Sequence, residues 1–149
     1  MKEDLITFET AKLAKEKSYK GGSNCLFILH NSTYEYDGDP NHLESYEEGD
    51  LTTDSKFYMV NGEPNLGDLS NEYYTLYERP SQSLLQKWLR EVHGIEVIPS
   101  PYSKRKSYGC EVYHYTEKNE NGYVPIELGS FKTYEEALEE GLQEGLKLI

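Results

Sequence analysis

Residues 35–78 carry nearly all of the net charge of this chain. Twelve acidic residues and a single lysine lie in this stretch, which gives −11 of the formal net charge of −12. The acidity therefore belongs to one segment and not to the protein as a whole. Glycine, proline, asparagine and serine recur through it, which indicates a long loop. We expect one domain over residues 1–149, with an acidic, loop-rich insertion at about 35–78 that has one short strand at 57–60.

The rest of the chain predicts three helices, over residues 7–19, 80–93 and 133–148. The middle helix has the clearest apolar stripe, at helical spacing: Leu84, Leu85, Trp88, Leu89 and Val92. Gly94 stands where a left-handed residue ends a helix, whereas Gly21 and Gly22 are expected to end the first helix. Thr133 and Glu136 form a capping box at the start of the third.

Five further segments predict strands. Residues 24–30 and 33–37 are expected to form a hairpin, and residues 96–98, 109–116 and 123–128 three later strands, with a turn at 119–122. Pro125 places the last strand at an edge. The order α-β-β-(loop)-α-β-β-β-α lacks regular alternation of strand and helix, so we expect an α+β fold, with an antiparallel or mixed sheet and helices packed on one side.

The last helix has small residues at a spacing of four. Ala137, Gly141 and Gly145 share one face, and each interior glycine costs about 1 kcal/mol relative to alanine. The backbone must therefore approach something closely. Two explanations are open: this face packs tightly on the sheet, or it forms a groove for self-association. Both a monomer and a homodimer are therefore open.

The chain has no sequence signal for a membrane. Its longest apolar run covers only residues 26–29, far from the roughly 20 residues of a spanning helix. The start of the chain lacks a basic region followed by an apolar stretch, so we expect a cytoplasmic protein. In that compartment Cys25 and Cys110 are expected to be free thiols.

Motifs for catalysis, metals and cofactors are missing. Residues 37–48 match the acidic positions of a calcium loop, but His42 stands in place of its glycine and Pro40 stiffens it. The four histidines have no metal-ligand spacing, and the cysteines lie in predicted strands. The one basic cluster, at 104–106, is a weak footprint for phosphates. We expect no enzyme, no metal, no cofactor and no direct binding of nucleic acid.

Three segments resemble a known family. Residues 80–93 (PSQSLLQKWLREVH), residues 133–144 (TYEEALEEGLQE) and residues 7–17 (TFETAKLAKEK) are similar to segments of a family of small uncharacterised proteins of gut-bacterial genomes and their phages. The resemblance implies a phage or prophage setting. It implies no chemistry, and it leaves out the acidic segment.

Tyrosines lie between the acids of residues 35–78 and give contact area at little entropic cost. We therefore expect a non-catalytic protein-interaction module that uses this acidic tyrosine-rich loop to contact a basic protein partner. The candidate binding residues are Glu44, Tyr46, Glu47, Glu48 and Asp50. The alternative is an acidic nucleic-acid mimic that inhibits a host defence protein, which would need carboxylates fixed in rows.

Overall fold

Two stretches far apart in the sequence form the first of two compact units in the computed structural model. The first unit comprises Met1–Tyr19 and Ser81–Ile149, and the second comprises Lys20–Pro80. The structure describes residues 4–30, 43–47, 58–60, 63–65, 74–102, 104, 106–115 and 125–149. The whole 35–78 segment belongs to the second unit.

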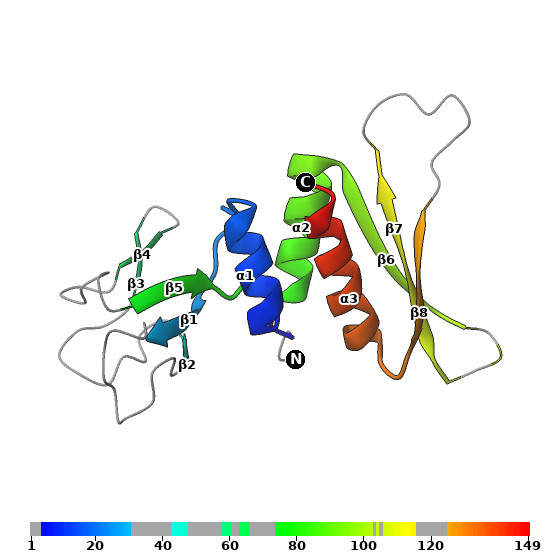
Figure 1. Cartoon of the computed structure of the whole chain (residues 1–149), viewed down its shortest axis with the longest axis horizontal. Coiled ribbons are helices and arrows are strands. Elements are labelled where there is room, and N and C mark those ends of the chain that lie inside the picture. The colour runs from blue at the N-terminus through cyan, green and yellow to red at the C-terminus, as the bar shows by residue number, and fades with distance from the viewer. Residues whose placement is uncertain are drawn as a thin grey trace. The chain divides into compact units, whose positions relative to one another are not determined.

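The first unit is a three-stranded antiparallel sheet with helices on one side (Figure 1). Its helices are α1 (Phe8–Glu16), α2 (Gln82–His93) and α3 (Tyr134–Lys147). Its strands are β6 (Ile95–Pro101), β7 (Tyr108–His114) and β8 (Ile126–Phe131), in the order β6-β7-β8. The predicted α+β class, with antiparallel strands and helices on one face, is confirmed. None of the described helices is long and apolar enough to cross a bilayer.

The helix ends follow from local sequence, with one correction. Gly94 ends α2 at a φ of 65°, and the Thr133 hydroxyl accepts the Glu136 N–H at 3.1 Å, as predicted. The Glu136 carboxylate reaches back to the Lys132 N–H. The first helix, however, ends at Glu16 and not at the glycine pair, because Ser18 takes the left-handed conformation at a φ of 58°.

The small-residue face of α3 packs on the sheet, which confirms the first of the two explanations. Ala137, Gly141 and Gly145 are all buried. A Cβ atom added at Gly141 would lie 2.5 Å from Val97 Cγ1 and closer still to Cys110 Sγ. The sheet therefore occupies the space that a self-association groove would need.

Aromatic rings fill the end of the core beside α2. Trp88 is 9% exposed, and the rings of Tyr19 and His93 meet its indole edge-on, with centroids 5.1 and 4.5 Å away. Trp88 is thus a core residue, as its place in the apolar stripe predicts.

The second unit has more regular structure than its composition predicts. β1 (Cys25–His30) lies between β2 (Leu43–Glu47) and β5 (Tyr74–Glu78), both antiparallel to it, and β3 (Tyr58–Val60) pairs with β4 (Glu63–Asn65). Four of these strands lie within residues 35–78, where only one was expected. The apolar run of β1 accounts for β2 and β5, because Leu26, Phe27 and Ile28 are buried and buried backbone groups need hydrogen-bond partners along both edges of the strand.

Two strand predictions change in the structure. β8 begins at Ile126, so Pro125 precedes the strand, although β8 is an edge strand as expected. The described partners of β1 are β2 and β5. The strand expected at 33–37 and the turn expected at 119–122 lie outside the described residues.

Candidate functional site

The predicted binding residues fall on or next to β2. Glu44 is half-buried in this strand, Tyr46 and Glu47 follow it there, and Glu48 and Asp50 lie outside the described residues, as do the side chains of Tyr46 and Glu47. Among the described strands β2 pairs with β1 alone, so it is one edge of its sheet. The structure thus brings Glu44, Tyr46 and Glu47 together on one sheet edge.

The side chain of Arg79, the residue after β5, contacts both of the other strands of that sheet. The Arg79 guanidinium lies over the Phe27 ring, 4.4 Å from its centroid. Its Nη1 also donates a hydrogen bond of 2.7 Å to Ser45 Oγ on β2. Because one cation joins the central strand to the edge strand, the acidic edge has a defined place in the second unit.

Cysteine and histidine often serve catalysis, and the structure shows the surroundings of Cys110 and His93. Burial raises the pKa of the Cys110 thiol to about 11, so the reactive thiolate is scarce at neutral pH. The His93 ring packs edge-on against Trp88. Within the described ranges no three histidine, cysteine or acidic side chains gather closely enough to hold a metal ion. The calcium-like residues 37–42 and 48 lie outside those ranges.

The basic cluster at 104–106 lies in the turn between β6 and β7. Lys104 and Lys106 are exposed, and position 105 lies outside the described residues. Neither lysine takes part in an ion pair with another described residue. Two solvated lysines at a turn are a small electrostatic footprint for nucleic acid.

A second candidate surface, which sequence reasoning missed, lies on the side of the β6-β7-β8 sheet away from the helices (Figure 1). Because side chains alternate along a strand, the residues that do not face α3 project there. We call this surface the open face and define it by Ile98, Glu111, Tyr113, Tyr115 and Glu127. Ile98 is 41% exposed and Tyr115 is 45% exposed.

Aromatic rings follow β7 along the open face. Tyr113 and Tyr115 stack with ring centroids 6.2 Å apart and planes 10° apart. At the far end of the strand the Tyr102 ring lies over Gly109, whose missing Cβ leaves room for it: an added Cβ would lie 2.7 Å from the Tyr102 hydroxyl. Tyrosine rings therefore lie on both sides of Glu111 along the open face.

Two carboxylates of like charge stand opposite each other on the open face. Glu111 of β7 is the direct cross-strand partner of Glu127 of β8, an arrangement that destabilises a sheet. The Tyr113 hydroxyl donates a hydrogen bond of 2.7 Å to Glu111 Oε2. That bond is the main reason why the pKa of Tyr113 is raised, and desolvation and the negative charges of Glu111 and Glu127 raise it further.

Replacing Glu111 with glutamine should lower the pKa of Tyr113 towards its ordinary value. The carboxylate favours the protonated phenol twice, by accepting its hydrogen bond and by repelling the phenolate. The change is read from the ring resonances of Tyr113 during an alkaline NMR titration. Glu140→Gln on the exposed side of α3 is the control, and an unchanged Tyr113 pKa in Glu111→Gln would contradict the hydrogen bond.

A buried carboxylate joins the three helices of the first unit. Glu139 of α3 is 8% exposed. Its Oε1 accepts the Thr7 N–H at 2.7 Å and the Thr10 hydroxyl, and its Oε2 accepts the Gln82 side-chain amide at 2.8 Å. The carboxylate thus lies at the N-termini of α1 and α2, where helix dipoles favour negative charge.

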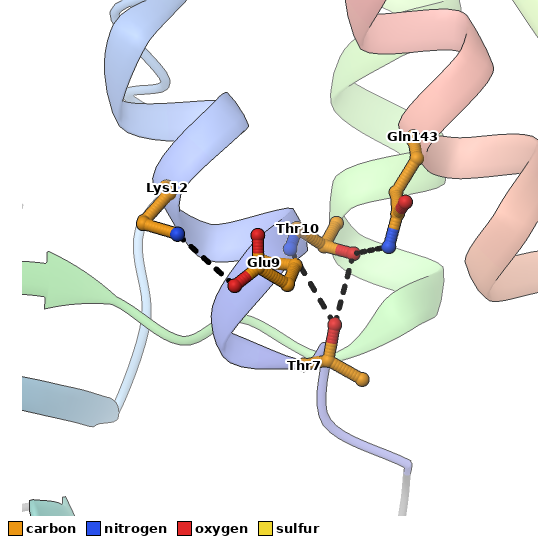
Figure 2. Close-up of polar contacts among 5 residues, drawn as sticks. All are labelled: Thr7, Glu9, Thr10, Lys12 and Gln143. Carbon is orange, nitrogen blue, oxygen red and sulfur yellow. Dashed lines mark hydrogen bonds and ion pairs between the residues drawn. The ribbon is translucent and has the colours of Figure 1, made fainter. Parts of the chain in front are cut away.

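Figure 2 shows the rest of this cluster. The Gln143 amide donates to the Thr10 hydroxyl at 3.0 Å, and the Thr7 and Thr10 hydroxyls lie 3.2 Å apart. Glu9 pairs instead with Lys12 at the surface, 3.0 Å away. Glu139 accepts hydrogen bonds on both oxygens, so its role is to join helices and not to bind a ligand. The available signal in the sequence was that Glu139 precedes Leu142 and Leu146 at helical spacings of three and seven, on their apolar face.

Comparisons with known proteins add no relative. No protein-family model matches the chain, and neither the curated proteins nor the solved structures contain a significant match. The resemblance of residues 7–17, 80–93 and 133–144 to a phage-associated family therefore stays a prediction.

Proposed function

We propose that this chain is a non-catalytic protein-binding module whose acidic 35–78 segment binds a basic protein partner. The observation that carries the proposal is the edge strand β2, which lies within the segment that holds −11 of the net charge of −12. The proposed setting is the cytoplasm of a phage-infected or prophage-bearing cell.

An acidic edge strand suits a basic partner for two reasons. The outer backbone groups of an edge strand can pair with an added strand, which gives affinity independent of side chains. Concentrated charge of one sign speeds the encounter with a partner of opposite sign and rejects partners of like sign. Tyr46, in the same strand, adds a residue type that is common in binding surfaces.

The register of β2 favours this proposal over a nucleic-acid mimic. Glu44 pairs with Ile28 and Glu47 with Cys25, so positions 44 and 47 belong to opposite faces of the strand. A mimic needs carboxylates in a row along one surface, with a spacing like that of phosphates. A recruiting strand needs no such row.

Exchange of the acids at β2 for their amides should abolish partner capture. The variant carries Glu44→Gln, Glu47→Gln, Glu48→Gln and Asp50→Asn. The tagged full chain is used to capture proteins from the lysate of a natural host, at increasing salt. We expect at least one basic protein that binds the wild type, is lost from the variant and is released as salt screens the charges.

The control variant changes the same number of exposed acids in the first unit: Asp4→Asn, Glu16→Gln, Glu135→Gln and Glu140→Gln. It has the same net charge as the β2 variant and should retain the partner. Equal loss in both variants would show that total charge decides binding, and retention by both would place the binding surface elsewhere. Either result rejects the proposal.

A further inference from the structure

Of the three acids on or beside the open face, one has a cationic partner among the described residues and two do not. Glu96, at its rim, lies 3.7 Å from the Arg90 guanidinium. Glu111 and Glu127 form no ion pair with a lysine or arginine among the described residues. Among the described residues, the Tyr113 hydroxyl donates a hydrogen bond to Glu111, which leaves the negative charge of both carboxylates in place. The two opposed carboxylates thus repel each other beside a half-apolar surface.

Apolar and aromatic groups surround this pair. Ile98 is the cross-strand partner of Glu111 on the other side and is 41% exposed, and the stacked Tyr113 and Tyr115 rings follow along β7. An exposed isoleucine and tyrosine rings therefore lie beside two carboxylates. A side chain that is both cationic and planar suits this surface, because it can stack on a ring and bond to carboxylates at once.

We propose that the open face docks an arginine-bearing segment of a protein partner, with a guanidinium between Glu111 and Glu127 and against the Tyr113 ring. The charge complementarity selects the occupant. Phosphates would be repelled by the same carboxylates, which excludes nucleic acid from this face. Lysine lacks the planar fork that bonds to carboxylates while it stacks on a ring, so arginine is the better fit. This surface belongs to the first unit and does not depend on the acidic segment.

The repulsion between Glu111 and Glu127 should also lower the stability of the free protein. The two carboxylates repel each other in the free protein, and a bound cation would neutralise that repulsion. Glu127→Gln should therefore raise the melting temperature of the free protein slightly while it weakens binding. A variant that merely damages the fold would lower both the melting temperature and the affinity.

The probe is a short peptide in which arginine alternates with valine, titrated into the isotopically labelled full chain and followed by NMR. The matched probe has citrulline, the neutral isostere, in place of arginine. We expect saturable shifts of the amides of residues 98, 111, 113 and 127 with the arginine peptide only. Glu111→Gln with Glu127→Gln should weaken this binding on the order of tenfold.

Glu16→Gln with Glu140→Gln makes the same change in net charge away from the sheet and should keep the affinity. The proposal is overturned if the citrulline peptide binds equally well, if both double variants weaken binding alike, or if the shifts avoid the open face. Shifts confined to β1, β2 and β5 that disappear in the β2 variant would support the proposed function and reject this surface. Shifts on the open face alone would support this surface, and the capture experiment with the β2 variant would then decide the proposed function separately.

Discussion

Replacing Glu139 with alanine should lower the free energy of unfolding by about 3 kcal/mol or more. The change removes the acceptor of the Thr7 N–H, the Thr10 hydroxyl and the Gln82 amide. A buried polar group that loses its partner costs about 1 to 3 kcal/mol. The Thr7 N–H is only part-buried and can bond to water instead. We therefore do not expect the loss to reach the sum of the penalties for all three donors. With a total stability of about 5 to 15 kcal/mol for a typical protein, the loss is large.

The matched control is Glu140→Ala, the same change one residue along on the exposed side of α3. Alanine is a better helix former than glutamate, so this variant should stay close to the wild type. Urea unfolding of both variants, followed by circular dichroism, gives the two free energies. Equal values for Glu139→Ala and Glu140→Ala would contradict the buried network.

Glu139→Gln removes the charge of this side chain and keeps its size and shape. The amide oxygen can still accept from Thr7 and Thr10, but the amide nitrogen then meets the Gln82 nitrogen, and two donors face each other. We expect a clear loss, smaller than that of Glu139→Ala. A double-mutant cycle with Gln82→Ala should give a coupling energy on the order of 1 kcal/mol, since the two side chains share a bond.

Gly141→Leu should destabilise the first unit by about 3 kcal/mol, at the upper end of the usual cost of overpacking. Even a methyl group at this position would lie 2.5 Å from Val97 Cγ1 and closer still to Cys110 Sγ. These atoms belong to buried residues of the β6-β7-β8 sheet, so they cannot move aside cheaply. Either α3 lifts from the sheet or the strands shift, and both expose apolar surface. The melting temperature measures the loss.

Gly145→Ala is the matched control for this prediction. Its added Cβ would lie 3.2 Å from Ile95 Cγ2 and from Leu89 Cδ1, contacts that a small adjustment relieves. The gain of about 1 kcal/mol in helix propensity should offset that adjustment. Gly141→Ala should destabilise in spite of the same gain, and Cys110→Ala should restore part of the loss by removing the Sγ atom. A melting temperature raised by Gly141→Ala would refute the close approach.

The first unit thus has a frame, which sets its stability, and a surface. The frame consists of the Glu139 cluster and the glycine face of α3, where substitutions act on folding. The open face consists of side chains on the other side of the same sheet, where Glu111 and Glu127 weaken the frame instead of supporting it. Residues that reduce stability in this way are candidates for function.

Local patterns in the sequence determined the α+β class and most elements of the first unit. The apolar stripe through Trp88, the terminating Gly94 and the capping pair of Thr133 and Glu136 each depend on residues within one or two helical turns. The same holds for the small-residue face of α3, because the cost of interior glycines requires a close neighbour. These interactions are local, so they can be read without knowledge of the fold.

Only the tertiary structure decided which distant residues meet. The pairing of β1 with β2 and β5 joins strands separated by long connections, and no local pattern encodes such a register. Glu139 lies 132 positions from Thr7, so its burial at two helix N-termini follows from helix packing alone. Glu111 and Glu127 are ordinary acids in the sequence. They become an opposed pair beside Tyr113 because the register of β7 and β8 places them across from each other.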